Sequence, residues 1–187
     1  MLFQAALLSF CVCAVGALGH AVVESPAPRK PGALADELCG AAVSKVMRRD
    51  LAGPIEVAVK AADQDYKCNA YLCRGFQYED NTDNLHTFHA GDIVDFHVDL
   101  VAGHRPGYAN VSVIDPSTNV VIGTPLKSWE AWPVNNPGPD RDDIDFNVTI
   151  PESLASICTE GGKCAIQWYW YSMSNSQTYE SCVDFVI

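Results

Sequence analysis

The sequence predicts an all-β fold: an antiparallel β-sandwich of the immunoglobulin-like or fibronectin-like type, with one short helix and long disulfide-pinned loops. Three observations predict it. Apolar and polar residues alternate over several short runs, turn residues separate these runs, and a single segment has helical spacing. The chain has 187 residues and shows no internal repeat, which is typical of one domain with its own core.

The strands are expected mainly in the second half of the chain. After Gly91, the residues Val94, Phe96, Val98 and Leu100 fall on one face of an extended segment, and polar residues fall on the other. Turn residues then separate further strand candidates. The strand candidates are a short one directly after His20, residues 21–24, and those at residues 108–115, 120–123, 146–150, 165–171 and 183–187.

One helix and one long loop are expected before these strands. Apolar residues repeat at three- and four-residue spacing over residues 34–50, and Gly53-Pro54 follows them, which predicts a helix that ends there. Residues 62–90 are polar with interspersed aromatic residues and two cysteines. They predict a long loop pinned by a disulfide, and long ordered loops are usually functional.

Residues 1–19 have the features of a secretory signal peptide. They are apolar and uncharged, although a positive n-region is missing, and they end in the small residues Ala17 and Gly19. Cleavage after Gly19 would make His20 the first residue of a single domain, residues 20–187. Since no second apolar run of about 18 residues follows, we expect a secreted, extracellular monomer without a membrane span.

The cysteines support an oxidising compartment. Cys11 and Cys13 fall in the signal peptide, and six remain: Cys39, Cys68, Cys73, Cys158, Cys164 and Cys182. They predict three disulfides, with 15 possible connectivities. Proximity in sequence favours Cys68–Cys73 and Cys158–Cys164, which would leave Cys39 with Cys182. The sequons at Asn110 and Asn147 predict N-glycosylation where these residues are exposed.

The net charge limits the classes of partner that we expect. A formal charge of −11 repels phosphate backbones and anionic lipids, so neither a nucleic acid nor a membrane is expected as a partner. A neutral polymer or a metal cation is compatible with this charge. Tyr66, Tyr71, Tyr78, Tyr108, Trp129 and Trp132 fall in loop-like segments, where they either stack on flat sugar rings or pack beneath the loops.

A mature N-terminal histidine would be a metal chelator. Its α-amine has a pKa of roughly 7.7–8.0, so a divalent metal can displace the proton, and the imidazole supplies a second nitrogen. A further imidazole would complete a three-nitrogen site suited to copper. His104, in a Gly/Pro turn after a strand, is the best candidate, whereas His86, His89 and His97 are better explained as loop or strand residues.

These features together resemble a known family. The N-terminal His20, the turn Gly103-His104-Arg105-Pro106-Gly107 and the run Gln177-Thr178-Tyr179-Glu180-Ser181-Cys182 are similar to the lytic polysaccharide monooxygenases, especially the chitin-binding type-4 and fungal members. The resemblance implies that His20 and His104 bind one copper ion. It also implies that Tyr179 is the axial residue and that Gln177 is a hydrogen-bond donor at the oxygen-binding face.

The resemblance further implies an activity. The protein would use an external electron donor to cleave an insoluble β-1,4-linked polysaccharide, cellulose or chitin, by oxidation. One feature departs from the family: some cellulose-active members carry a histidine several residues before the glutamine, whereas here that region reads Trp168-Tyr169-Trp170-Tyr171. Two alternatives stay open. One is a copper-binding protein for uptake or storage that does not oxidise glycans, and the other is a carbohydrate-binding module.

Overall fold

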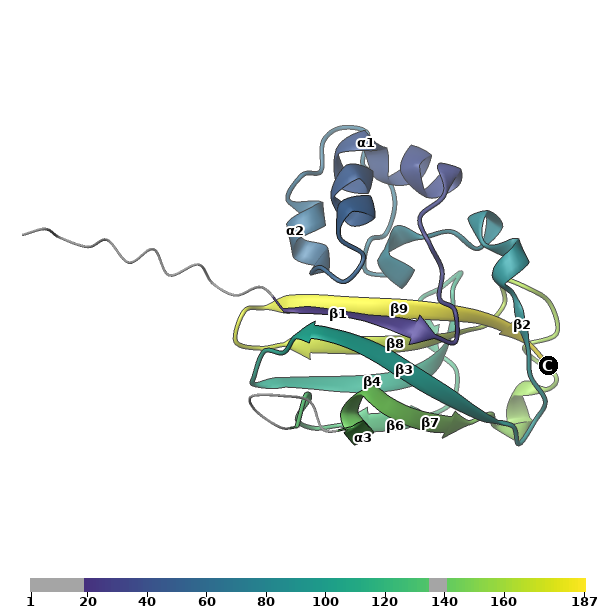
Figure 1. Ribbon diagram of the computed structural model, residues 1–187. Coiled ribbons are helices and arrows are strands. Elements are labelled where there is room, and N and C mark those ends of the chain that lie inside the picture. The colour runs from purple at the N-terminus through teal and green to yellow at the C-terminus, as the bar shows by residue number, and fades with distance from the viewer. Residues whose placement is uncertain (1–18, 135–140) are drawn as a thin grey trace, which may run out of the picture.

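The computed structural model describes residues 19–134 and 141–187, and in these the fold is a two-sheet β-sandwich with a helical layer on one side (Figure 1). The predicted sandwich is therefore confirmed. The smaller sheet has the strand order β1-β3-β7, and the larger has the order β2-β9-β8-β4-β5, with β6 also paired to β4. The strands are β1 (His20–Ser25), β2 (His86–Thr87), β3 (Ile93–Ala102), β4 (Gly107–Asp115), β5 (Val120–Val121), β6 (Lys127–Trp129), β7 (Asp145–Thr149), β8 (Ala165–Ser172) and β9 (Gln177–Val186).

The main core lies between the two sheets. On β3, Val94, Phe96 and Val98 are buried there, as the alternating pattern predicted, while the residues between them face outward. Trp168 and Trp170 of β8 face the same core from the larger sheet and are fully buried. Alternate residues of a strand point to opposite faces, so this arrangement fixes the register of both sheets.

The predicted helix is present as α1 (Ala33–Arg49), and a short helix α2 (Ile55–Val59) follows it. Buried residues on α1 recur at four-residue spacing, at Ala35, Cys39, Val43 and Met47, so one face packs into a second core with α2. Figure 1 shows this helical layer lying against β1 and β9. The sequence pattern missed α2, because five residues are too few to show helical periodicity.

The preferred disulfide pairing was wrong in two of three bridges. The structure pairs Cys39 with Cys68, Cys73 with Cys182, and Cys158 with Cys164. Cys39 lies on the inner face of α1, where the segment before Cys73 passes, while Cys73 lies against β9. Proximity in sequence identified only the Cys158–Cys164 bridge, because the other two join residues far apart in the chain: Cys39 with Cys68 within the helical layer, and Cys73 with Cys182 of β9.

Smaller differences concern the loops. The predicted loop at residues 62–90 contains three short 3₁₀ turns and β2, which pairs with β9 in parallel, so the larger sheet is not wholly antiparallel. The short helix α3 (Arg141–Ile144) precedes β7. The predicted signal peptide lies outside the described residues except for Gly19. None of the helices in the described part of the chain is long and apolar enough to cross a membrane.

Candidate copper site

The sandwich brings the two candidate histidines together at one end. β1 and β3 are antiparallel, and His20 pairs with Ala102 in their register, so the turn that carries His104 begins beside His20. Gly19 lies within this site. A Cβ atom added to Gly19 would stand 2.5 Å from Cδ2 of His104 and 2.6 Å from the hydroxyl oxygen of Tyr179. Only a residue without a side chain fits between these two groups.

The imidazole of His104 has an unsatisfied nitrogen. Its Nε2 atom is buried, and no hydrogen-bond partner for it exists among residues 19–134 and 141–187. A buried polar nitrogen without a partner is costly, so native proteins rarely keep one without a reason. Neutral imidazole nitrogen is also a preferred copper ligand, and a bound metal would satisfy this atom.

The His20 ring is oriented by a carboxylate that contacts its Nε2 atom. Nε2 of His20 lies 2.8 Å from Oδ2 of Asp50, the residue that ends α1. A carboxylate in this position holds the proton on Nε2, and Nδ1 then carries the lone pair that a metal would use. The helix terminus thus selects the tautomer that chelation by the amine and the same ring requires.

Tyr179 and Gln177 form the buried wall of the site. The Tyr179 hydroxyl donates a hydrogen bond of 2.8 Å to Oε1 of Gln177, which leaves the amide N–H groups as the donors of Gln177. The Tyr179 ring stacks on Trp170 with ring centroids 4.2 Å apart. Burial, followed by the nearby carboxylates of Glu56 and Asp50, raises the pKa of the Tyr179 phenol above its usual value, so this group is a neutral phenol near pH 7.

The residues present fit a copper ion. His20 and His104 supply imidazoles, and cutting the Gly19–His20 peptide bond would add an amine that opens toward the space Gly19 now fills. Within the described ranges, no group of three or more His, Cys, Asp or Glu side chains could hold a metal. A site of two histidines and an amine has only two metal-binding side chains, so it would not form such a group. With only three nitrogen ligands from the protein, it would leave coordination positions open.

The other histidines lie elsewhere. His97 of β3 is 2.7 Å from Asp145 on the outer face of the smaller sheet. His86 bonds the carbonyl oxygen of Ala27 at 3.1 Å, and His89 lies in the exposed turn before β3. Each is placed as the loop or strand explanation predicted.

The loop aromatics divide between the two explanations. Trp132 is fully buried, and Trp129 packs edge-on against Phe146 with ring centroids 5.0 Å apart, so both are packing residues. Tyr71 and Tyr108 remain exposed, each at 39%. Tyr108 of β4 pairs with Tyr171 of β8, and on the outer face of the larger sheet its ring contacts those of Tyr169 and Tyr171.

Sequence reasoning missed two residues of this site, Asp50 and Trp170. Asp50 is far from both histidines in the sequence, and only the packing of α1 against β1 brings it to His20. Trp170 belongs to the main core, and its ring also forms the stacking surface for Tyr179. Trp170 alternates with Ile166 and Trp168 on the buried face of β8, but this alternation does not show which residue of β9 lies opposite it.

Comparison with known proteins places the chain in a family. The family model described as "Lytic polysaccharide mono-oxygenase, cellulose-degrading" matches residues 20–185. The match covers nearly all of the chain and begins at His20, and the protein belongs to this family. In the comparison with curated proteins, nothing matches.

Solved structures show weaker likeness. An AA10 lytic polysaccharide monooxygenase from Streptomyces lividans is 13% identical, over 64% of this chain and 75% of the other, with a TM-score of 0.41. A CBM33 protein from Bacillus amyloliquefaciens in complex with Cu(I) is 12% identical, over 89% and 99%, with a TM-score of 0.43. A chitin-binding domain from Burkholderia pseudomallei is 14% identical, over 72% and 71%, with a TM-score of 0.36. The family match does not support the fungal part of the predicted resemblance.

Proposed function

We propose that the protein is a secreted, copper-dependent lytic polysaccharide monooxygenase that cleaves β-1,4-linked glycans by oxidation. One observation carries this proposal: the buried Nε2 atom of His104 lacks a partner and borders the Gly19–His20 junction and the Tyr179 hydroxyl. The start of the family match at residue 20 supports a mature chain that begins with His20.

Each residue of the site has a distinct role in this proposal. His20 and His104 hold the metal, and Asp50 keeps the His20 ring in the chelating tautomer. Tyr179 would lie beside the bound metal as a neutral phenol, held in place by stacking on Trp170. Gln177 is fixed by its bond to Tyr179, which aims its amide donors. Copper, when bound, supplies the redox chemistry that oxidises C1 or C4 of the glycan with oxygen or peroxide.

Cellulose and chitin are the proposed substrates, and the family's description as cellulose-degrading supports cellulose. Neither polymer carries charge along its backbone, which suits a protein with a net charge of −11. The exposed Tyr108 ring, in the strand that begins just after the His104 turn, offers a flat face on which a sugar ring can stack. We expect Tyr108→Ala to weaken binding to the insoluble polymer without changing copper affinity.

The decisive experiment is mass spectrometry of soluble products from cellulose and chitin. The protein, processed to begin at His20, is loaded with copper and supplied with a reductant and peroxide. We expect oxidised oligosaccharides, and we expect none from His104→Ala, with His97→Ala as a matched histidine control that stays active. Tight copper binding without oxidised products would instead identify a protein for copper uptake or storage. If neither copper binding nor oxidation occurs, only a carbohydrate-binding role remains.

A further inference from the structure

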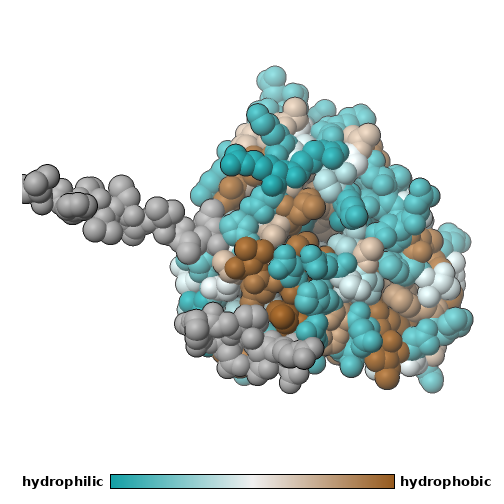
Figure 2. All heavy atoms as spheres, viewed as in Figure 1, coloured by the Kyte–Doolittle hydropathy of each residue, from teal (hydrophilic) through white to brown (hydrophobic). Residues whose placement is uncertain are grey.

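The loop between α1 and α2, residues 50–54, holds the first two residues of β1. Oδ2 of Asp50 lies 2.8 Å from Nε2 of His20. The carbonyl oxygen of Ala52 accepts a hydrogen bond of 3.0 Å from the backbone N–H of Ala21. Figure 2 shows apolar side chains on the surface over β1, below the helical layer. Apolar contacts are non-directional, so the orientation of the imidazole ring depends on hydrogen bonds such as the one between His20 and Asp50.

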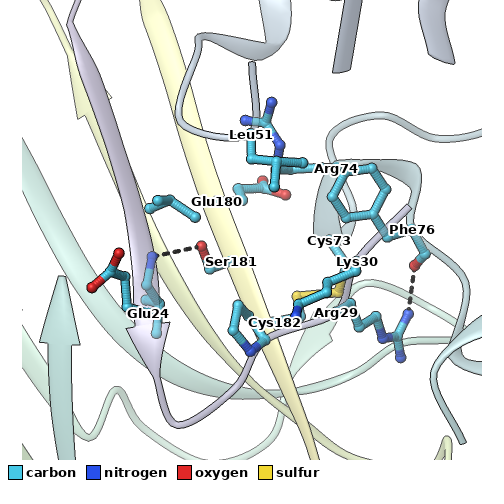
Figure 3. Close-up of a pocket in the computed structure, with 13 residues that line it drawn as sticks. Glu24, Arg29, Lys30, Leu51, Cys73, Arg74, Phe76, Glu180, Ser181 and Cys182 are labelled. Carbon is cyan, nitrogen blue, oxygen red and sulfur yellow. Dashed lines mark hydrogen bonds between the residues drawn. A yellow bond between two sulfur atoms is a disulfide. The ribbon is translucent and has the colours of Figure 1, made fainter. Parts of the chain in front are cut away.

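A buried arginine pins the backbone of this loop near both of its ends. Arg74 is 3% exposed, and its guanidinium donates to the carbonyl oxygens of Gly53 and Asp50 at 2.7 and 3.2 Å. Figure 3 shows Arg74 beside Leu51, which belongs to the same loop. The backbone N–H of Asp50 also donates to the carbonyl oxygen of Val46 in α1, at 3.1 Å. The loop backbone therefore cannot shift without breaking buried hydrogen bonds, which is costly.

Arg74 also has a backbone conformation that is rare for its residue type. Its φ is 60° and that of the preceding Cys73 is 52°, so two successive residues with side chains lie in the left-handed region. This conformation is unfavourable and persists where the surrounding contacts impose it, which is common at functional sites. The bridge from Cys73 to Cys182 ties the turn to β9. The strained turn thus holds the guanidinium where it reaches two carbonyl oxygens of the loop.

Gly53 leaves room for the carboxylate of Asp50. A Cβ atom added to Gly53 would stand 2.5 Å from Oδ2 of Asp50 and 2.7 Å from its Cγ, which is closer than Cβ atoms approach other atoms in proteins. The next nearest atom, at 3.1 Å, is the other oxygen of the same carboxylate. The φ of Gly53 lies outside the left-handed region that favours glycine. An alanine here would therefore conflict with the Asp50 side chain and not with its own backbone conformation.

We propose that Gly53 is a positioning residue of the candidate copper site, and that Arg74 fixes the loop in which it acts. Because Arg74 pins the loop backbone, a side chain at residue 53 displaces the carboxylate of Asp50 from His20 instead of moving the loop. Gly53 thus sets the place of the group that orients a proposed copper ligand, although it supplies no ligand atom itself. This inference rests on the proposed copper site but not on glycan oxidation.

The test compares Gly53→Ala, Asp50→Ala and the double variant with the wild type, each processed to begin at His20. In the metal-free protein with isotope-labelled histidine, the NMR chemical shift of Nε2 of His20 reports its hydrogen bond to Asp50. We expect Gly53→Ala to move this signal toward its position in Asp50→Ala. We also expect Gly53→Ala to bind copper(II) about tenfold more weakly than the wild type, as when a metal ligand loses the partner that orients it. The double variant should match Asp50→Ala within about twofold, because Gly53 acts through Asp50.

A second glycine provides the matched control. Gly123 has a φ of 79°, and an added Cβ would meet nothing within 4 Å, so Gly123→Ala strains the backbone without a clash. It should lower the free energy of unfolding but leave the Nε2 signal and the copper affinity unchanged, which separates positioning from a general loss of stability. Two results would overturn the proposal: a wild-type Nε2 signal in Gly53→Ala, or an undiminished loss of affinity when Gly53→Ala is added to Asp50→Ala. If the wild type binds no copper, the proposed function fails, while the NMR comparison still decides this inference.

Discussion

Nε2 of His20 and Oδ2 of Asp50 lie 2.8 Å apart, which joins the first strand of the sandwich to the end of its longest helix. The backbone carbonyl of Asp50 accepts a bond from the buried Arg74, so the loop that carries the carboxylate is itself held in place. The helical layer therefore has a role at the candidate copper site, because it determines which nitrogen of the His20 ring can bind a metal.

We expect Asp50→Ala to lower the affinity for copper(II) by about 10–100-fold, because the His20 ring loses the group that fixes its tautomer. Asp50→Asn should retain part of this affinity, because an amide oxygen still accepts a hydrogen bond. Competition titration measures the affinity, and the electron paramagnetic resonance spectrum of the copper-loaded protein should change in parallel. Asp36→Ala removes an exposed carboxylate from the same helix and serves as the control. Equal affinities in all four proteins would show that Asp50 does not orient the ligand.

We expect copper binding to depend on cleavage before His20. A chain that keeps Gly19 has a peptide bond in place of the amine, and Gly19 fills the space between His104 and Tyr179. The protein that begins at His20 should therefore bind copper(II) at least about 100-fold more tightly than one that begins at Gly19. Isothermal titration of both proteins at one pH measures the difference. Similar affinities would exclude the amine as a ligand.

The sequence predicted β3 well because alternation shows its buried face, at Val94, Phe96 and Val98. It missed β2 and β6, which have only two and three residues and are too short to show alternation. It also placed His20 and His104 in one site, although that inference came from resemblance and chemical type. The sequence pattern did not predict the contacts between layers. The bond between His20 and Asp50 depends on how the helical layer packs against β1, and the bridge from Cys73 to Cys182 depends on the contact with β9. Local periodicity carries no information about either contact.

The Cys73–Cys182 bridge should contribute more stability than the Cys158–Cys164 bridge. It closes a loop of 109 residues in the unfolded chain, whereas the other closes a loop of six. Loop-closure entropy gives about 4–5 kcal/mol for the long loop and about 2 kcal/mol for the short one. Chemical denaturation of the two double Cys→Ser variants measures the difference, and peptide mapping without reduction checks the pairing. A larger loss from removing the short bridge would contradict this expectation.

Glu180 should make the stability of the metal-free protein depend on pH. Burial raises the pKa of its carboxyl from 4.5 to about 7, although the backbone amide and guanidinium of Arg74 act in the opposite direction. Between these two values the folded state binds a proton that the unfolded state has released, so the stability contribution is complete below about pH 4.5 and is lost as pH rises through 7. Glu180→Gln cannot titrate and should remove this component, on the order of 1–3 kcal/mol, from the pH profile of the unfolding free energy. If the profiles of the wild type and Glu180→Gln are parallel between pH 4.5 and 7, the carboxyl ionises normally in the folded protein.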